Sequence, residues 1–182
     1  EAAAARAVLE EDERLHGKFM AGEAHYAAQL MKDGEYSPDV QTTLIIDKPT
    51  RRQQDVPTQD RQRHDDPKTL EGLHRWRSST WGVYVAGVGL MLIVTHESVR
   101  GGGNATATVV ETALQWLQAN GHPIGRRLTL ILDNTAADHK NLTMLTYLAS
   151  LVKRRVVREA HTFYQKVGHT YNKLDTIFAV LI

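Results

Sequence analysis

Three aspartates in this chain of 182 residues stand where carboxylates could hold a metal ion. Asp47 follows the apolar run Thr-Leu-Ile-Ile, Asp133 follows Leu-Thr-Leu-Ile-Leu, and Asp175 stands in the last helical pattern. Carboxylates that converge repel one another unless a cation lies between them, and hard oxygen ligands suit Mg²⁺ or Mn²⁺. Two such ions could activate a water or a 3′-hydroxyl and stabilise the leaving oxygen of a phosphodiester. The pattern predicts a catalytic metal site formed by Asp47, Asp133 and Asp175.

Each acid also has a simpler interpretation. Asp47 precedes Lys48-Pro49 and could close a turn, and Asp133, which Asn-Thr follows, could cap a turn or a helix. Asp175 could be a solvated helix residue. The metal site therefore depends on an order of helices and strands that brings the three acids together.

The periodicity of apolar residues predicts those elements. Residues 1–38 read as an Ala-rich helical segment, and residues 39–182 as a core that the chain end cuts within its last helix. The core is expected to contain a strand over 42–47, two strands within 81–95, a helix from 104 that stops at 120–121, a strand over 128–133, a helix over 139–153, a strand over 159–167 and a final helix.

This order of elements is that of a ribonuclease-H-like α/β fold. Three antiparallel strands come first, and two right-handed crossovers then extend a mixed sheet. Strands 42–47 and 128–133 are then neighbours and parallel, and Asp47 and Asp133 meet at the edge where sites in α/β sheets collect.

The composition excludes several other classes of protein. There are no cysteines, so there is no disulfide framework and no thiolate zinc site. The longest apolar stretch, 81–95, is broken by glycines and shorter than a bilayer span, so no membrane partner is expected. The acidic N-terminus is unlike a signal or transit peptide, and we expect a nuclear or other intracellular protein. The missing initiator Met and the end within a pattern indicate a fragment of a longer chain or assembly.

Two local basic segments could contact a nucleic-acid backbone, although the net charge of the chain is only +1. Residues 48–80 hold eight Lys or Arg against five acids, without periodicity, and predict a long loop. A dense cluster at 153–158 could contact phosphates or could complement the dipole of the preceding helix. The residues predicted to contact nucleic acid are Arg51, Arg52, Lys140, Lys153, Arg154, Arg155 and Arg158.

Four segments, in the same order, resemble a group of uncharacterised transposase-derived proteins. TLIIDKPTRRQQDVP resembles their LIID-x-x-x-Q…P segment, LTLILDNTAADHKN their LDN-x-x-x-x-NKN segment, and VGHTYNKLD their VGHTHEDVD segment. GGGNAT is similar to a Gly-Asn-Thr stretch that opens their first helix. The resemblance covers most of residues 15–182. It implies the ribonuclease-H-like fold of DDE/DDD transposases and integrases, with Asp47, Asp133 and Asp175 as the metal ligands.

The same resemblance draws attention to His169, which precedes the third acid. It could act as a general base or lie near a phosphate, or it could simply cap the last helix. His139 and His161 have no partners at metal-ligand spacing and are predicted to be structural or on the surface.

The chain departs from the group around each acid. Residues 48–51, Lys-Pro-Thr-Arg, replace Gly-Met-Asp-Gln, and Asp138-His139 replaces Glu-Asn. Residues 171–173, Tyr-Asn-Lys, replace His-Glu-Asp. Three hypotheses therefore stay open: a metal-dependent polynucleotidyl transferase or nuclease, a degenerate or domesticated copy that binds nucleic acid or protein without catalysis, and a structural subunit.

Overall fold

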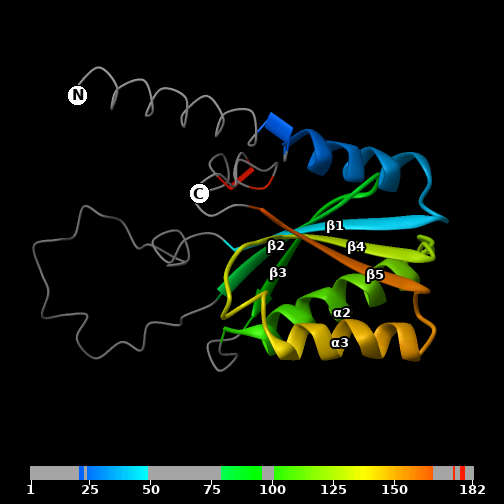
Figure 1. Cartoon of the computed structure of the whole chain (residues 1–182). Coiled ribbons are helices and arrows are strands. Elements are labelled where there is room, and N and C mark those ends of the chain that lie inside the picture. Colours follow the sequence, from blue (N-terminus) through cyan, green and yellow to red (C-terminus); the bar gives the residue numbers. More distant parts are fainter. Residues whose placement is uncertain are drawn as a thin grey trace, which may run out of the picture.

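The computed structural model describes residues 21–22, 24–48, 79–95, 101–165, 174 and 177–178. They form a mixed α/β fold in which helices cover both faces of one five-stranded sheet (Figure 1). Residues 24–36 are helical. The other elements are β1 (Gln41–Asp47), β2 (Ser79–Val85), β3 (Gly89–Thr95), α2 (Gly103–Ala119), β4 (Arg127–Asp133), α3 (Leu142–Lys153) and β5 (Glu159–Gln165). The order of elements predicted from the periodicity is confirmed over these residues.

The strands are arranged in the order β3-β2-β1-β4-β5. β2 pairs antiparallel with both β1 and β3, whereas β4 pairs parallel with β1 and with β5. The prediction that β1 and β4 are parallel neighbours is therefore confirmed. The carboxyl ends of β1, β4 and β5 all lie at one edge of the sheet.

Two apolar cores lie on the two faces of the sheet. Leu44 and Leu130 point toward α2 and α3, and they belong to the larger core. Ile45 and Ile131, one position further along each strand, point to the other face with Leu174 and Phe178. The helix at 24–36 covers part of that second face (Figure 1). The alternation of side chains along each strand thus decides which core a residue joins.

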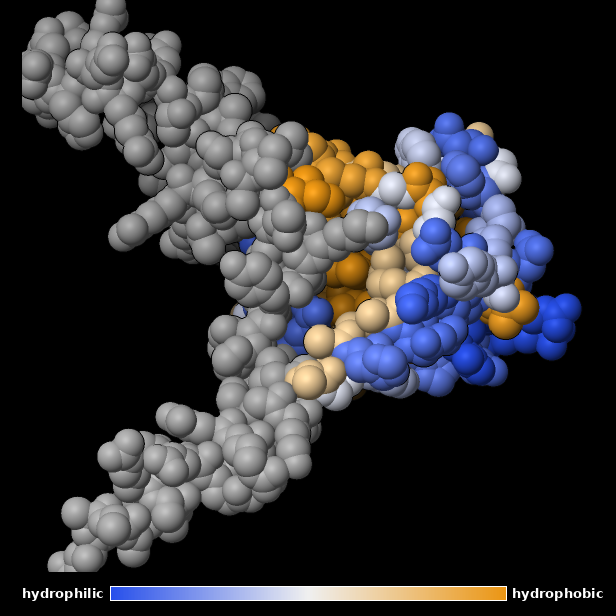
Figure 2. Space-filling model, turned by 90° about the horizontal axis from the view of Figure 1, so that it is seen from above, coloured by the Kyte–Doolittle hydropathy of each residue, from blue (hydrophilic) through white to orange (hydrophobic). Residues whose placement is uncertain are grey.

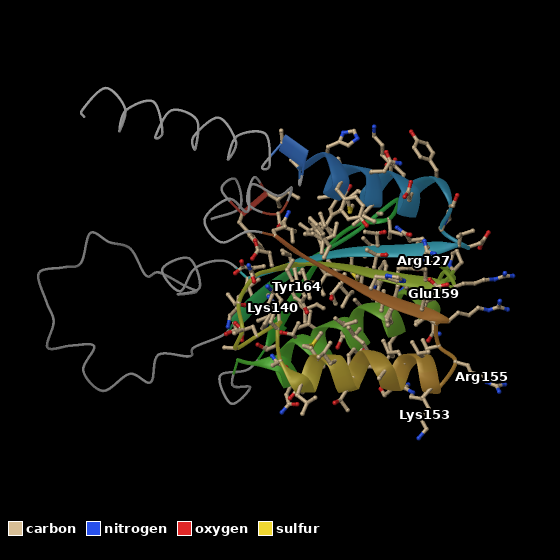
Figure 3. The ribbon with its side chains drawn as sticks, viewed as in Figure 1. Arg127, Lys140, Lys153, Arg155, Glu159 and Tyr164 are labelled. Atoms are coloured by element: carbon tan, nitrogen blue, oxygen red, sulfur yellow. The ribbon has the colours of Figure 1, made fainter. Side chains whose placement is uncertain are left out.

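The second face is not uniformly covered. Figure 2, a view onto the side of the helix at 24–36, shows apolar residues toward the middle and hydrophilic residues at the right-hand end. On the outermost strand β3, Leu92 is 50% exposed and Val94 is 65% exposed. The hydrophilic end includes the starts of β4 and β5, where charged side chains project (Figure 3).

Helix α2 has the apolar stripe that its sequence predicts. Val109, Val110, Ala113, Leu114 and Leu117 are all buried. Their spacing of three to four residues places them on one side of a helix. The helix ends as expected before residue 121, a glycine with a φ of +73°.

Helix α3 begins at Leu142, so the predicted start at residue 139 was wrong. The Asn141 side chain accepts a hydrogen bond from the Met144 amide, as an N-cap residue does. Before it, the amides of His139 and Lys140 both donate to the Thr135 carbonyl, which closes a turn. The polar side chains of this segment thus favour a capped loop over an additional helical turn.

Gly125 is needed where the chain enters β4, because the backbone of β1 lies against it. A Cβ at this position would be 2.5 Å from the Gln41 nitrogen. We expect Gly125→Ala to lower the free energy of unfolding by about 1–3 kcal/mol. Gly22→Ala is the control, because nothing lies within 4 Å of its Cβ position and alanine favours a helix. Urea melts should shift in opposite directions, and an unchanged midpoint for Gly125→Ala would contradict the close approach.

Candidate metal centre

Asp47 and Asp133 are the last residues of two neighbouring parallel strands. The last pair in the printed register is Ile46 with Leu132, so the two aspartates stand one step further on, side by side. Adjacent strands are about 4.8 Å apart, which brings the two Cα atoms to roughly that separation. The edge of the sheet that carries these two residues is called the carboxylate edge below.

The two aspartates also share a face of the sheet. Each stands two residues beyond an isoleucine, Ile45 or Ile131, that points into the second core. Side chains two positions apart on a strand point the same way, so both carboxylates point toward the face of that core. This geometry brings together two of the three predicted metal ligands.

The two carboxylates make the same local hydrogen bond. Oδ1 of Asp47 accepts from the Lys48 amide at 2.7 Å, and Oδ1 of Asp133 accepts from the Asn134 amide at 2.6 Å. Both side chains are half-buried. Backbone donors of this kind hold a carboxylate in a fixed orientation. Two oriented carboxylates are suitable oxygen ligands for a divalent cation.

Leu174 and Phe178, which stand on either side of the third acid in the sequence, approach the sheet close to Asp47. Gly82 of β2 is the register partner of Asp47. A Cβ at Gly82 would be 2.6 Å from Cζ of Phe178 and 3.0 Å from Cδ2 of Leu174. Leu174, which directly precedes Asp175 in the sequence, is fully buried there. Asp175 itself lies outside the described residues.

Lys48 lies on the other side of the strand end. Its Nζ is 5.0 Å from the centre of the Trp81 ring, and Trp81 belongs to the core beneath α2 and α3. The cation thus stacks over an aromatic face and not over the carboxylates. The Lys48 ammonium group therefore lies away from the face of the two acids.

The loop between β4 and α3 is locked to the start of α2. Oδ1 of Asp138 accepts from the Gly102 amide at 2.6 Å, and the Thr106 hydroxyl donates to the Asp138 carbonyl at 2.9 Å. A side chain at Gly103 would collide with the amide of Asn141. Two motifs that resemble the transposase-derived group, GGGNAT and LDNTAADHKN, therefore pack against each other and fix the chain that follows Asp133.

His139 braces the backbone at Asp133. It is only 4% exposed, and its Nδ1 lies 2.8 Å from the Asp133 carbonyl oxygen and 3.2 Å from the Thr135 hydroxyl. Because a carbonyl can only accept, Nδ1 carries the proton in that bond. Its Nε2 has no hydrogen-bond partner among the described residues. The prediction of a structural histidine agrees with this burial, but its contact with Asp133 was not foreseen.

Lys140 is the one predicted nucleic-acid contact at the carboxylate edge within the described part of the chain. Its side chain is exposed, and Nζ lies 4.8 Å from the centre of the Tyr164 ring on β5 (Figure 3). The Tyr164 hydroxyl in turn donates to the His139 carbonyl at 3.4 Å. Lys140 thus has a fixed position at the carboxylate edge, on the face of the sheet that α2 and α3 cover.

The predicted basic cluster lies at the opposite edge. Lys153 ends α3, and Arg158 precedes the first residue of β5, where the parallel strands begin. Strand β4 advances about 3.3 Å per residue, so roughly 20 Å separates its first residue from Asp133. Figure 3 shows Lys153 and Arg155 at this end of the molecule and Lys140 at the other. The basic cluster and the two acids therefore do not share a site.

Arg154 is partly neutralised by its surroundings. It pairs with Glu111 of α2 at 3.4 Å, and the Tyr147 hydroxyl donates to the same carboxylate at 2.9 Å. Partial burial raises the pKa of Glu111, but the hydrogen bonds from Tyr147 and Arg154 outweigh it and lower that pKa overall. Burial and the neighbouring Glu111 raise the pKa of Tyr147, so its hydroxyl stays protonated at neutral pH. Arg154 therefore links α3 to α2.

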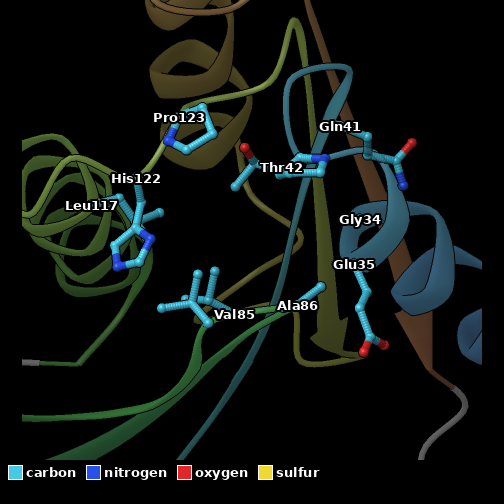
Figure 4. Close-up of a pocket in the computed structure, with 12 residues that line it drawn as sticks. Gly34, Glu35, Gln41, Thr42, Val85, Ala86, Leu117, His122 and Pro123 are labelled. Carbon is cyan, nitrogen blue, oxygen red and sulfur yellow. The ribbon is translucent and has the colours of Figure 1, made fainter.

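A pocket of about 120 Å³ lies at the edge of the sheet where β1 begins (Figure 4). Its lining includes Glu35, Thr42 and His122, together with residues of the turn between β2 and β3. The Thr42 hydroxyl already accepts from the Gly125 amide at 2.8 Å. The pocket is small and lies at the opposite edge from Asp47, so it is not part of the candidate metal centre.

The remaining predictions fall on residues that the structure does not describe. These are Arg51, Arg52 and His169, in addition to Asp175. Within the described ranges, no group of three or more His, Cys, Asp or Glu residues could hold a metal ion. The described part of the centre is thus the pair of aspartates. No helix among the described residues is long and apolar enough to cross a membrane.

Comparison with known proteins identifies a family without an assigned function. Neither the curated proteins nor the solved structures include a match. Residues 68–182, well over half of the chain, match DUF7869, a domain of unknown function. The matched range contains Asp133 and Asp175 and begins after Asp47. The chain therefore belongs to the DUF7869 family.

Proposed function

We propose that this chain is the ribonuclease-H-like core of a transposase-like protein, which cuts or joins DNA strands with divalent metal. The observation that carries this proposal is the register of β1 and β4, which ends both strands in an aspartate on the same face. The strand order β3-β2-β1-β4-β5 supports it as well, because it is the order expected for that fold.

Asp47, Asp133 and Asp175 are the residues that would hold Mg²⁺ or Mn²⁺. A metal held by these residues would ease deprotonation of a water or of a 3′-hydroxyl of the substrate and would stabilise negative charge on the leaving oxygen. The chain itself supplies two carboxylates whose Oδ1 atoms are fixed by backbone amides. The His139 ring donates a hydrogen bond to the carbonyl oxygen of Asp133. Hydrogen bonds around a metal ligand commonly fix its orientation in this way.

A second candidate function is DNA binding without catalysis. Acids that flank the first and third proposed ligands in the group that the chain resembles are replaced here at residues 50, 172 and 173. Lys140 would contribute to either function, because its exposed ammonium lies at the carboxylate edge. Metal binding distinguishes the two candidates.

Metal binding is expected to stabilise the folded chain by mass action. A cation held by the native carboxylates at a hundred times its Kd adds about 2.7 kcal/mol to the free energy of unfolding. Asp133→Asn should remove this gain and slightly raise the stability of the metal-free protein, because it removes a repulsion between carboxylates. Thermal melts with and without millimolar Mn²⁺ or Mg²⁺ measure both effects.

Asp138→Asn is the matched control for this experiment. Asp138 lies in the loop that follows Asp133, but its carboxylate accepts from the Gly102 amide before the start of α2. An asparagine oxygen can accept that bond equally, so this variant should keep the full metal-induced shift. Equal shifts in the wild type and in Asp133→Asn would contradict a specific site and favour the binding module.

A further inference from the structure

Six basic side chains gather at the end of the sheet opposite Asp47 and Asp133. The sheet brings two segments together there, because the Arg126 carbonyl accepts from the amides of both Arg158 and Glu159. All six side chains are exposed. The group, called the basic end below, consists of Arg126, Arg127, Lys153, Arg154, Arg155 and Arg158.

Most of the charge at the basic end is not neutralised. Arg127 pairs with Glu159 at 3.0 Å, and Arg154 pairs with Glu111. The other four basic residues have no ion pair with a described carboxylate. The net charge of the chain is only +1, so this end concentrates positive charge that the molecule as a whole does not have.

Arg155 keeps a backbone conformation that glycine would adopt more easily. It follows the C-cap of α3 with a φ of 61°, and the amides of Arg155 and Val156 donate to the Val152 and Leu151 carbonyls. This is the Schellman arrangement, in which glycine is usual at this position. An arginine here is strained, and it directs one more cation to the basic end.

Complementing the dipole of α3 explains only part of this charge. Lys153 is the one basic residue in the last turn of that helix. Arg127 is the first residue of β4 and Arg126 precedes it, and Arg158 precedes β5. The cations of the basic end therefore come from three parts of the chain. Complementing the dipole of one helix does not explain them all.

We propose that the basic end binds the phosphate backbone of duplex DNA, at a second contact separate from the carboxylate edge. The choice of DNA over other polyanions rests on the proposed function, and five arginines among six cations suit the geometry of phosphate groups. The contact lies roughly 20 Å from Asp133, along the length of β4. It needs no divalent metal, because the six cations supply the charge directly.

The test is binding of a fluorescein-labelled 30-base-pair duplex to the full chain in EDTA, measured by anisotropy across a salt series. The slope of log K against log salt is negative, and each lost phosphate contact makes it less steep by about 0.9. Arg126→Gln/Arg158→Gln should thus reduce its steepness by about 1.8 and weaken binding at least tenfold at low salt. Lys48→Gln, which removes a cation over Trp81, should leave the slope unchanged.

Arg155→Gly separates lost contact from lost folding. Glycine relieves the strained backbone, so Tm should rise by about 2 °C. The slope of log K against log salt should nevertheless become less steep by about 0.9. A more stable variant that binds DNA more weakly supports the proposal, whereas wild-type binding by both this variant and the double variant overturns it.

Other partners and the catalytic proposal give different outcomes. If the double variant loses binding to phosphatidylserine vesicles or to polyglutamate and keeps its affinity for the duplex, the basic end serves another partner and the proposal is wrong. Asp47→Asn/Asp133→Asn should bind the duplex in EDTA with the wild-type slope. If the wild-type chain binds the duplex in this way but shows no metal-dependent cleavage, the catalytic proposal is wrong and the proposed contact at the basic end stands.

Discussion

Asp133→Asn should lower Mn²⁺-dependent nicking of supercoiled DNA by about a thousand-fold or more, which corresponds to about 4 kcal/mol of activation free energy. Asparagine keeps the size of the side chain and can still accept from the Asn134 amide. It removes the negative charge that a divalent cation requires. Asp47→Asn should have a similar effect, because Asp47 occupies the equivalent position on β1.

The double variant tests whether the two acids act together. When residues act together in one catalytic site, the effects of their substitutions on the reaction rate are far from additive. Asp47→Asn/Asp133→Asn should therefore be no slower than the slower single variant. Asp138→Asn, which alters a carboxylate bound to the start of α2, should retain activity within a few-fold. A single variant that nicks at the wild-type rate would show that the two aspartates are not catalytic.

Much of the fold could be predicted because its strands and helices carry unambiguous apolar patterns. Strand β4 is a nearly continuous apolar run, as expected for a strand covered on both faces, and its core residues are completely buried. Helix α2 has a stripe with helical spacing. Each pattern is local, so one sequence is enough to recognise it.

That Asp47 and Asp133 lie side by side could be predicted from the sequence. The face of the sheet to which their side chains point could not. Both residues end an apolar run, and the order of elements makes their strands neighbours. Which face they point to depends on side-chain alternation within a register that only the folded sheet defines. The same holds for Gly82, since its position beside Leu174 depends on pairing between distant segments.

The features missed in the sequence depend on side-chain contacts across the fold. The start of α3 is displaced because Asn141 caps it and the preceding residues form a hydrogen-bonded turn. The contact of His139 with the Asp133 carbonyl results from that turn. Arg126 joins Arg158 only through the pairing of β4 with β5, although 32 residues separate the paired Arg127 and Glu159. Local pattern alone contains none of these contacts.

Gly82→Val should both destabilise the chain and weaken its affinity for Mn²⁺. The new side chain would occupy the space of Phe178 and Leu174, which are 4% and 0% exposed. Overpacking of this kind lowers the free energy of unfolding by about 1–3 kcal/mol. Because Leu174 immediately precedes Asp175, displacing it should also disturb the third proposed ligand.

Phe178→Leu provides the compensating change. A smaller side chain makes room at Gly82, so Gly82→Ala and Phe178→Leu should couple favourably by about 0.5–3 kcal/mol in a double-mutant cycle. Gly125→Ala is the matched control, because it overpacks the opposite edge of the sheet against β1. It should destabilise the chain without changing the Kd for Mn²⁺ measured well below Tm. If Gly82→Val also leaves that Kd unchanged, the segment that contains Asp175 does not complete the metal centre.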